Sequence, residues 1–86
     1  MNWDFLLANK AQRAFRAMPA NDKARINRAF NEMKVEPLSG DIVALKGEYQ
    51  GQFRRRVGAW RIIFELNPTA RLILVHDIAR RTSTTY

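Results

Sequence analysis

The stretch Gln52–Leu66, QFRRRVGAWRIIFEL, decides the fold of this 86-residue chain. Its apolar and polar side chains alternate with a period of two residues, which is typical of β-strands. We expect strands at Gln52–Val57 and Trp60–Leu66, joined by Gly58–Ala59, because a glycine at the first turn position favours a two-residue type II′ hairpin. This segment therefore predicts an antiparallel β-hairpin.

Apolar segments further along and at the start of the chain predict two more strands. Asn67–Ala70 (NPTA) is typical of a turn, and Arg71–Ile78 (RLILVHDI) of a mostly buried third strand. Asn2–Leu7 (NWDFLL) is short and apolar, and its periodicity fits either an opening strand or the start of a helix. We expect a three-stranded meander that the N-terminal strand widens.

Between these strands the apolar residues follow a helical period. The first helix has an apolar face at positions i, i+3, i+4 and i+7, formed by Ala11, Ala14, Phe15 and Met18. The second helix repeats that spacing with Ile26, Ala29, Phe30 and Met33. Asn9 is the candidate N-cap of the first helix, and Asn21 or Asp22 that of the second. Pro19 ends the first helix and Pro37 closes off the second.

Together these elements predict a small α+β fold in one domain spanning residues 1–86. It consists of an N-terminal strand and a two-helix hairpin packed on one face of a small antiparallel β-sheet. The other face of that sheet is then open to solvent or to a partner.

Charge is the informative part of the composition. Fifteen Lys and Arg against eight Asp and Glu give a formal net charge of +7. There is no cysteine, which excludes disulfides and thiolate metal sites and makes the cytoplasm the expected compartment. The start, MNWDFLLANK, lacks the basic stretch of a signal peptide, and no apolar run approaches the roughly 20 residues of a membrane span. The excess charge indicates either a polyanionic partner or a solvated basic surface.

The alternation of side chains sorts the arginines of the hairpin. Arg54 and Arg56 point to one side of their strand, and Arg55 to the other together with Phe53 and Val57. If the apolar side faces the helices, then Arg54, Arg56 and Arg61 project from the open face. Converging guanidinium groups suit a phosphodiester backbone and stabilise charge on a pentacovalent phosphate. The alternative is a basic surface that only binds an acidic partner peptide.

Other candidate residues are weaker. His76, the single histidine, lies in an apolar strand, where a structural residue is more common than a general base. Four acidic residues follow no metal-ligand spacing, so neither a metal nor a cofactor is expected: Asp41, Glu48, Glu65 and Asp77.

Several of these segments resemble the RelE/ParE toxin family of bacterial type II toxin–antitoxin systems. They are LKG at Leu45–Gly47, FRRRVGAWRIIFEL at Phe53–Leu66, VHDIARR at Val75–Arg81, and the closing Tyr86. The resemblance covers most of the chain, and RVGAWRI is its most specific part. It implies a small α+β fold and a cognate antitoxin that wraps the toxin.

In the RelE branch the resemblance implies a metal-independent endoribonuclease that cuts mRNA in the ribosomal A site. There the 2′-hydroxyl attacks the neighbouring phosphate. In the ParE branch it implies an inhibitor of DNA gyrase without nuclease activity. We expect the RelE activity, with the ribosome and mRNA as partners, and keep the ParE activity as the alternative.

The resemblance also implies which residues are catalytic. Arg54 and Arg56 occupy the two basic strand positions, and Arg61 follows the turn. Arg81 (or Arg80) takes the late arginine position and Tyr86 the terminal aromatic one. Arg61 and Arg81 would stabilise charge in the transition state, and Tyr86 would orient the nucleotide.

Three further basic residues are expected to bind RNA around this set: Arg55, Arg80 and Lys46. The family's best-known ribonuclease has lysines where this chain has Arg54 and Arg56. Arginine stays protonated and is a poor general base. The proton acceptor is therefore open between Tyr86, His76 and a group of the ribosome.

Overall fold

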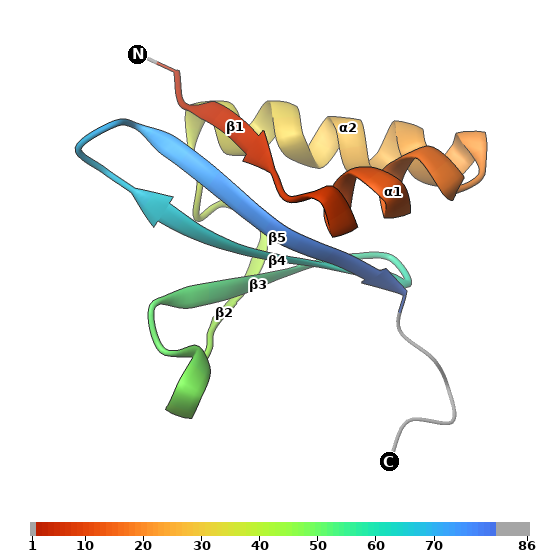
Figure 1. The fold of residues 1–86 in the computed structure, drawn as a ribbon. Coiled ribbons are helices and arrows are strands. Elements are labelled where there is room, and N and C mark those ends of the chain that lie inside the picture. The colour runs from red at the N-terminus through yellow and green to blue at the C-terminus, as the bar shows by residue number, and fades with distance from the viewer. Residues whose placement is uncertain (1, 81–86) are drawn as a thin grey trace.

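The computed structural model describes residues 2–80, which form two helices packed against a five-stranded sheet (Figure 1). The helices are α1 (Asn9–Ala17) and α2 (Ala20–Val35), and a short 3-10 helix, η1, spans Gly47–Tyr49. The strands are β1 (Asp4–Leu7), β2 (Asp41–Ala44), β3 (Gln52–Val57), β4 (Trp60–Asn67) and β5 (Leu72–Arg80). Both helices cover the same face of the sheet, so the predicted α+β fold is confirmed.

The sheet has the strand order β1-β5-β4-β3-β2. Three neighbouring pairs are antiparallel, but β1 runs parallel to β5, with Asp4 beside Leu72 and Leu7 beside Val75. The sheet is therefore mostly antiparallel, as predicted, and it is mixed only through this one parallel pair. A parallel neighbour needs a long crossover instead of a hairpin, and here α1, α2 and three strands separate the two partners along the chain.

The hairpin at the centre of the sheet forms as predicted. Val57 and Trp60 are paired at its closed end, where Gly58 has φ +59°. Ala59 is outside the positive-φ region, and glycine alone at positive φ fits the predicted type II′ turn. Strand β2 has no counterpart among the predicted strands. Its four residues pair with β3 and leave only Ile42 in contact with the core.

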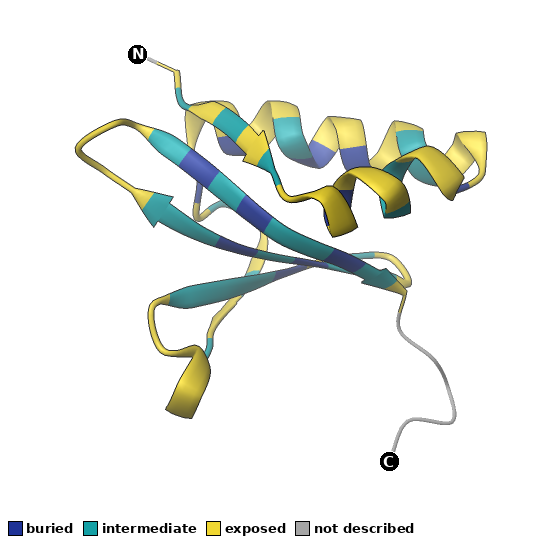
Figure 2. Ribbon diagram, viewed as in Figure 1, coloured by how far each residue is buried: buried dark blue, intermediate teal, exposed yellow. Residues whose placement is uncertain are grey.

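The core lies between the helices and the sheet (Figure 2). Ile62 and Phe64 of β4 are fully buried, as the alternation predicts. The core residues from the helices and from β5 are Ala11, Met18, Ile26, Ala29, Met33, Ile73, Val75 and Ile78. Full burial of one such Ile, Phe or Met side chain contributes about 1.5–3 kcal/mol. The apolar helix faces predicted from the sequence are therefore the faces that pack against the sheet.

The helix starts differ from the prediction. Asn9 is the first residue of α1 and not its N-cap, which is Ala8 without a side-chain hydrogen bond. Helix α2 begins at Ala20 directly after Pro19, ahead of both predicted caps. Proline holds φ near the helical value and sets the chain direction at that point. Neither helix in residues 2–80 is long and apolar enough to cross a membrane.

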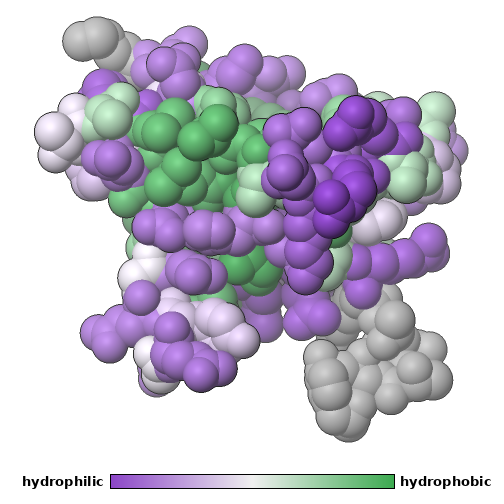
Figure 3. Space-filling view, viewed as in Figure 1, coloured by the Kyte–Doolittle hydropathy of each residue, from purple (hydrophilic) through white to green (hydrophobic). Residues whose placement is uncertain are grey.

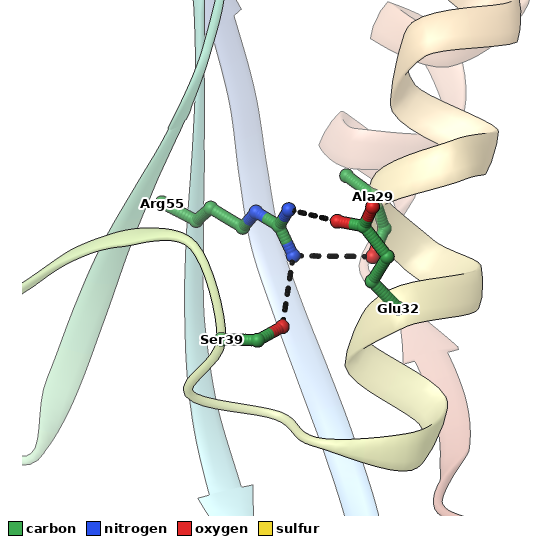
Figure 4. Close-up of polar contacts among 4 residues, drawn as sticks. All are labelled: Ala29, Glu32, Ser39 and Arg55. Carbon is green, nitrogen blue, oxygen red and sulfur yellow. Dashed lines mark hydrogen bonds and ion pairs between the residues drawn. The ribbon is translucent and has the colours of Figure 1, made fainter.

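A buried arginine joins β3 to α2 (Figure 4). The Arg55 side chain is 8% exposed and crosses to the helix. Its Nη1 donates to Ala29 O at 3.3 Å and to Ser39 Oγ at 3.5 Å, and its Nη2 donates to Glu32 Oε1 at 2.5 Å. These bonds connect the helix, the segment after it and the sheet, so Arg55 has a structural role.

Gly40 gives this guanidinium its space, and we expect Gly40→Ala to lower the free energy of unfolding by about 2–4 kcal/mol. Gly40 has φ +86°, and a Cβ there would lie 2.9 Å from three atoms of Arg55. The matched control is Gly47→Ala, where φ is +68° but no atom lies within 4 Å of the added Cβ. The control should lose only about 1–2 kcal/mol in urea unfolding, and equal losses would contradict the contact with Arg55.

Candidate nucleic-acid interface

Three arginines share the face of the sheet that the helices leave open. In antiparallel pairs, residues directly opposite one another project from the same face. Arg56 is opposite Arg61, and Arg54 is opposite Ile63 on β4. Because Arg55 between them points to α2, Arg54, Arg56 and Arg61 project from the open face, as the alternation predicts. We call these three residues the arginine cluster.

The arginine cluster concentrates positive charge, and Asp41 of β2, which lies directly opposite Arg56, forms no ion pair with it. Directly opposed like charges such as Arg56 and Arg61 repel one another. Within residues 2–80, no side chain of the cluster forms an ion pair with another described residue. The Nε of Arg61 is buried and has no hydrogen-bond partner there. Three guanidinium groups that form no ion pairs make a surface suited to an anion.

A β-bulge brings two more polar side chains to the open face. Ile63 pairs with Asp77 while the next residue, Phe64, pairs with Val75, so His76 is an extra residue in β5. Val75 and Ile78 are both buried, with two residues between them instead of one. His76 and Asp77 therefore both lie on the side away from the helices. Bulges re-aim side chains in this way, often beside functional sites.

Both of these side chains have a charged neighbour. The Nε2 of His76 lies 2.6 Å from Oε1 of Glu65, and both side chains are about two-fifths exposed. The Asp77 carboxylate lies 3.3 Å from the Lys10 ammonium of α1. Glu65 and Asp77 are thus partnered locally, and neither forms an ion pair with the arginine cluster.

A groove of about 460 Å³ lies against the bulge. Its lining residues come from α1, from the segment around η1 and from the three central strands: Lys10, Leu45, Tyr49, Gln52, Ile63, His76 and Asp77. Ile63 is the direct neighbour of Arg54 across the sheet, and Gln52 stands two residues before Arg54 on the same face. The groove and the arginine cluster are therefore adjacent.

Other predicted site residues lie elsewhere. Arg55 is buried against α2, so the expectation that it binds RNA is corrected: its strand position turns it into the core. Arg80 pairs with Trp60 and stands 5.9 Å over the Trp60 ring, on the opposite face from Arg61. Arg80 therefore does not lie on the open face, where it was predicted to bind RNA. Lys46 is exposed and directly precedes η1. Arg81 and Tyr86 lie outside the described residues.

The contacts of the bulge were not predicted from the sequence. Glu65 and His76 come to lie together because β4 and β5 are neighbours, and Asp77 meets Lys10 through the placement of α1. Glu65 lies on the same face of β4 as Arg61 and Ile63, because side chains alternate along a strand. A regular strand would have placed Asp77 on the opposite face from His76. Among residues 2–80, no group of three or more His, Asp or Glu side chains is arranged to hold a metal ion.

This chain is similar to known proteins in its structure. No protein-family model matches the chain, and no curated protein matches it. The archaeal RelE–RelB complex from Pyrococcus horikoshii matches with a TM-score of 0.83 at 20% identity, over 98% of this chain and 100% of that one. The RelB–RelE antitoxin–toxin complex from Methanococcus jannaschii matches with a TM-score of 0.71 at 26% identity, over 87% and 88%.

A third similar structure is the YoeB/ParE toxin from Agrobacterium tumefaciens. It matches with a TM-score of 0.80 at 16% identity, over 92% of this chain and 99% of that one. This chain shares with these structures a small α+β fold with two helices on one face of a mixed sheet. That fold is the RelE/ParE fold, which confirms the resemblance seen in the sequence.

Proposed function

We propose that this protein is the toxin of a toxin–antitoxin pair and that it cuts mRNA on the ribosome. The observation that carries the proposal is the arginine cluster: Arg54, Arg56 and Arg61 project from one open sheet face and have no ion-pair partners in the described chain. The similar structures include complexes of RelE with RelB, and the fold similarity supports the same class of function.

The cluster suits the charge changes of RNA cleavage. When a 2′-hydroxyl attacks the adjacent phosphorus, the bond to the 5′-oxygen breaks and a 2′,3′-cyclic phosphate remains. Negative charge builds up on the phosphoryl oxygens during this step. Planar guanidinium groups hold such oxygens in pairs, and fixed donors stabilise the transition state more than the ground state. We assign the phosphate to Arg56 and Arg61, which stand opposite each other, and the adjoining backbone to Arg54.

The partner we propose is an antitoxin that covers this face. An apolar area extends over β1 and the neighbouring part of β5 (Figure 3). On β1, Leu6 is 57% exposed, and Leu74 of β5 is its direct neighbour across the sheet. An amphipathic, acidic segment would bury this area and neutralise the net charge of +7. Large exposed apolar side chains beside a charged surface are typical of protein-binding sites.

The test is a reconstituted bacterial translation reaction with purified protein, in which primer extension maps the mRNA ends. We expect new ends within codons of the A site, and none when ribosomes are left out. Intact mRNA in the complete reaction would overturn the nuclease proposal. A gyrase supercoiling assay would then test the ParE alternative.

A further inference from the structure

We propose that the groove beside the arginine cluster holds a single unpaired RNA base next to the phosphate that the cluster binds. The inference rests on the proposed RNA-cutting function and names the part of the substrate that the groove recognises. It is based on the lining of the groove, its position and its charge. When a phosphate of the RNA lies at the arginines, the base in the groove belongs to the neighbouring nucleotide of the same RNA chain.

The lining has the parts of a base site. Leu45 and Ile63 line the groove with apolar side chains. Tyr49, which is 54% exposed, has an aromatic ring on which a base can stack. Gln52 adds an amide that both donates and accepts hydrogen bonds. The volume of about 460 Å³ lies in the range of small-molecule sites and is enough for one nucleotide.

Its position connects the groove to the phosphate site. Arg54, Ile63 and Asp77 lie side by side on three neighbouring strands. Adjacent strands are about 4.8 Å apart, so Asp77 is about two strand spacings from Arg54. A nucleotide that extends from the cluster toward β5 therefore reaches the groove without leaving the sheet surface.

Its charges allow a polyanion to approach. The Asp77 carboxylate is paired with Lys10, and Glu65 is hydrogen-bonded to His76, so neither acid is an isolated negative charge. Asp77 is 23% exposed in its side chain and, as a carboxylate, only accepts hydrogen bonds. It therefore favours a base with an amino group. Adenine, cytosine and guanine carry one, and uracil does not.

The first experiment measures binding on the isolated protein, labelled with ¹⁵N and ¹³C, by titration with each of the four nucleoside 3′-monophosphates. We expect NMR signals of Ile63, Tyr49 and His76 to shift, with the uridine compound binding weakest. Tyr49→Ala should weaken binding at least about fivefold because a stacking ring is lost. Tyr49→Phe keeps the ring and should bind like the unchanged protein.

A second pair of variants tests the polar edge. Asp77→Asn keeps the shape of the side chain and replaces one accepting oxygen with a donating amide. We expect it to weaken binding of the amino-bearing nucleotides about fivefold and to remove the discrimination against uridine. The control is Arg28→Ala on the exposed surface of α2, which should leave all four affinities unchanged.

The outcomes separate this inference from the proposed function. Shifts confined to Arg54, Arg56 and Arg61 with equal affinity for all four bases would overturn the base site, whatever the nuclease assay shows. Binding in the groove by a protein that cuts no mRNA would leave the base site standing and overturn only the nuclease. Groove signals that shift with polyglutamate and with none of the nucleotides would assign the groove to an acidic protein partner.

Discussion

Replacing Arg61 with alanine is expected to lower the rate of mRNA cutting about 100- to 1,000-fold. Arg61 stands opposite Arg56, and its residue is partly buried with Nε shielded from solvent, so its side chain has less freedom before substrate binds than a fully exposed arginine has. Donors that are already oriented lose little when charge develops on the phosphate, which is why their removal acts on the chemical step. The measurement is the rate of appearance of primer-extension products under single-turnover conditions.

Two further variants serve as comparisons for the Arg61→Ala result. Arg61→Lys keeps the charge and loses the planar fork, and it should retain part of the activity. Arg28→Ala removes an exposed arginine from α2, on the helical side, and should cut at the normal rate. If Arg28→Ala fell as far as Arg61→Ala, general loss of positive charge would explain both results and the assignment to Arg61 would fail.

Arg55→Ala is expected to lower the free energy of unfolding by about 2–4 kcal/mol. The substitution leaves a void in the core and removes the contacts with Ala29, Ser39 and Glu32. Because Glu32 is 53% exposed, water replaces part of what its carboxylate loses, and this keeps the effect below that of a fully buried pair. A small domain has roughly 5–15 kcal/mol of stability, so the loss should be clear in urea unfolding.

The neighbouring residue provides the matched control. Arg54 has the same side chain one position away, but it projects from the open face. Arg54→Ala should change the stability by less than about 0.5 kcal/mol and should weaken RNA binding. The reverse pattern, in which Arg55→Ala stays stable and loses RNA affinity, would return Arg55 to the interface and contradict its structural role.

Most of the fold was predictable because local patterns agree with one another. The alternation in Gln52–Leu66 and the helical spacing on α1 and α2 identify the elements and the buried faces. The direction of β1 was not predictable, because the sequence of a short apolar strand does not indicate which strand it pairs with. Strand β2 was missed for a related reason: its side chains are mostly exposed, and only its hydrogen bonds to β3 define it.

Only the part of the candidate site that follows from the two-residue alternation along a β-strand was predictable. A period of two separates Arg55 from Arg54 and Arg56, but the sequence does not show that Glu32 of α2 meets Arg55 inside the protein. The bulge at His76 is a property of the pairing between β4 and β5, and one strand alone does not reveal it. The groove depends on that bulge, so no spacing in the sequence indicates it.

The parallel pairing of β1 with β5 has a consequence for folding during synthesis. β1 leaves the ribosome first, and its only strand partner in the described sheet is the last strand to emerge. Pairing between such distant segments closes a large loop and is slow compared with the formation of a hairpin. A nascent chain that ends before Leu72 also lacks the side of the core that Ile73, Val75 and Ile78 supply. The core and the open face are thus completed late in synthesis, because both need residues of β5.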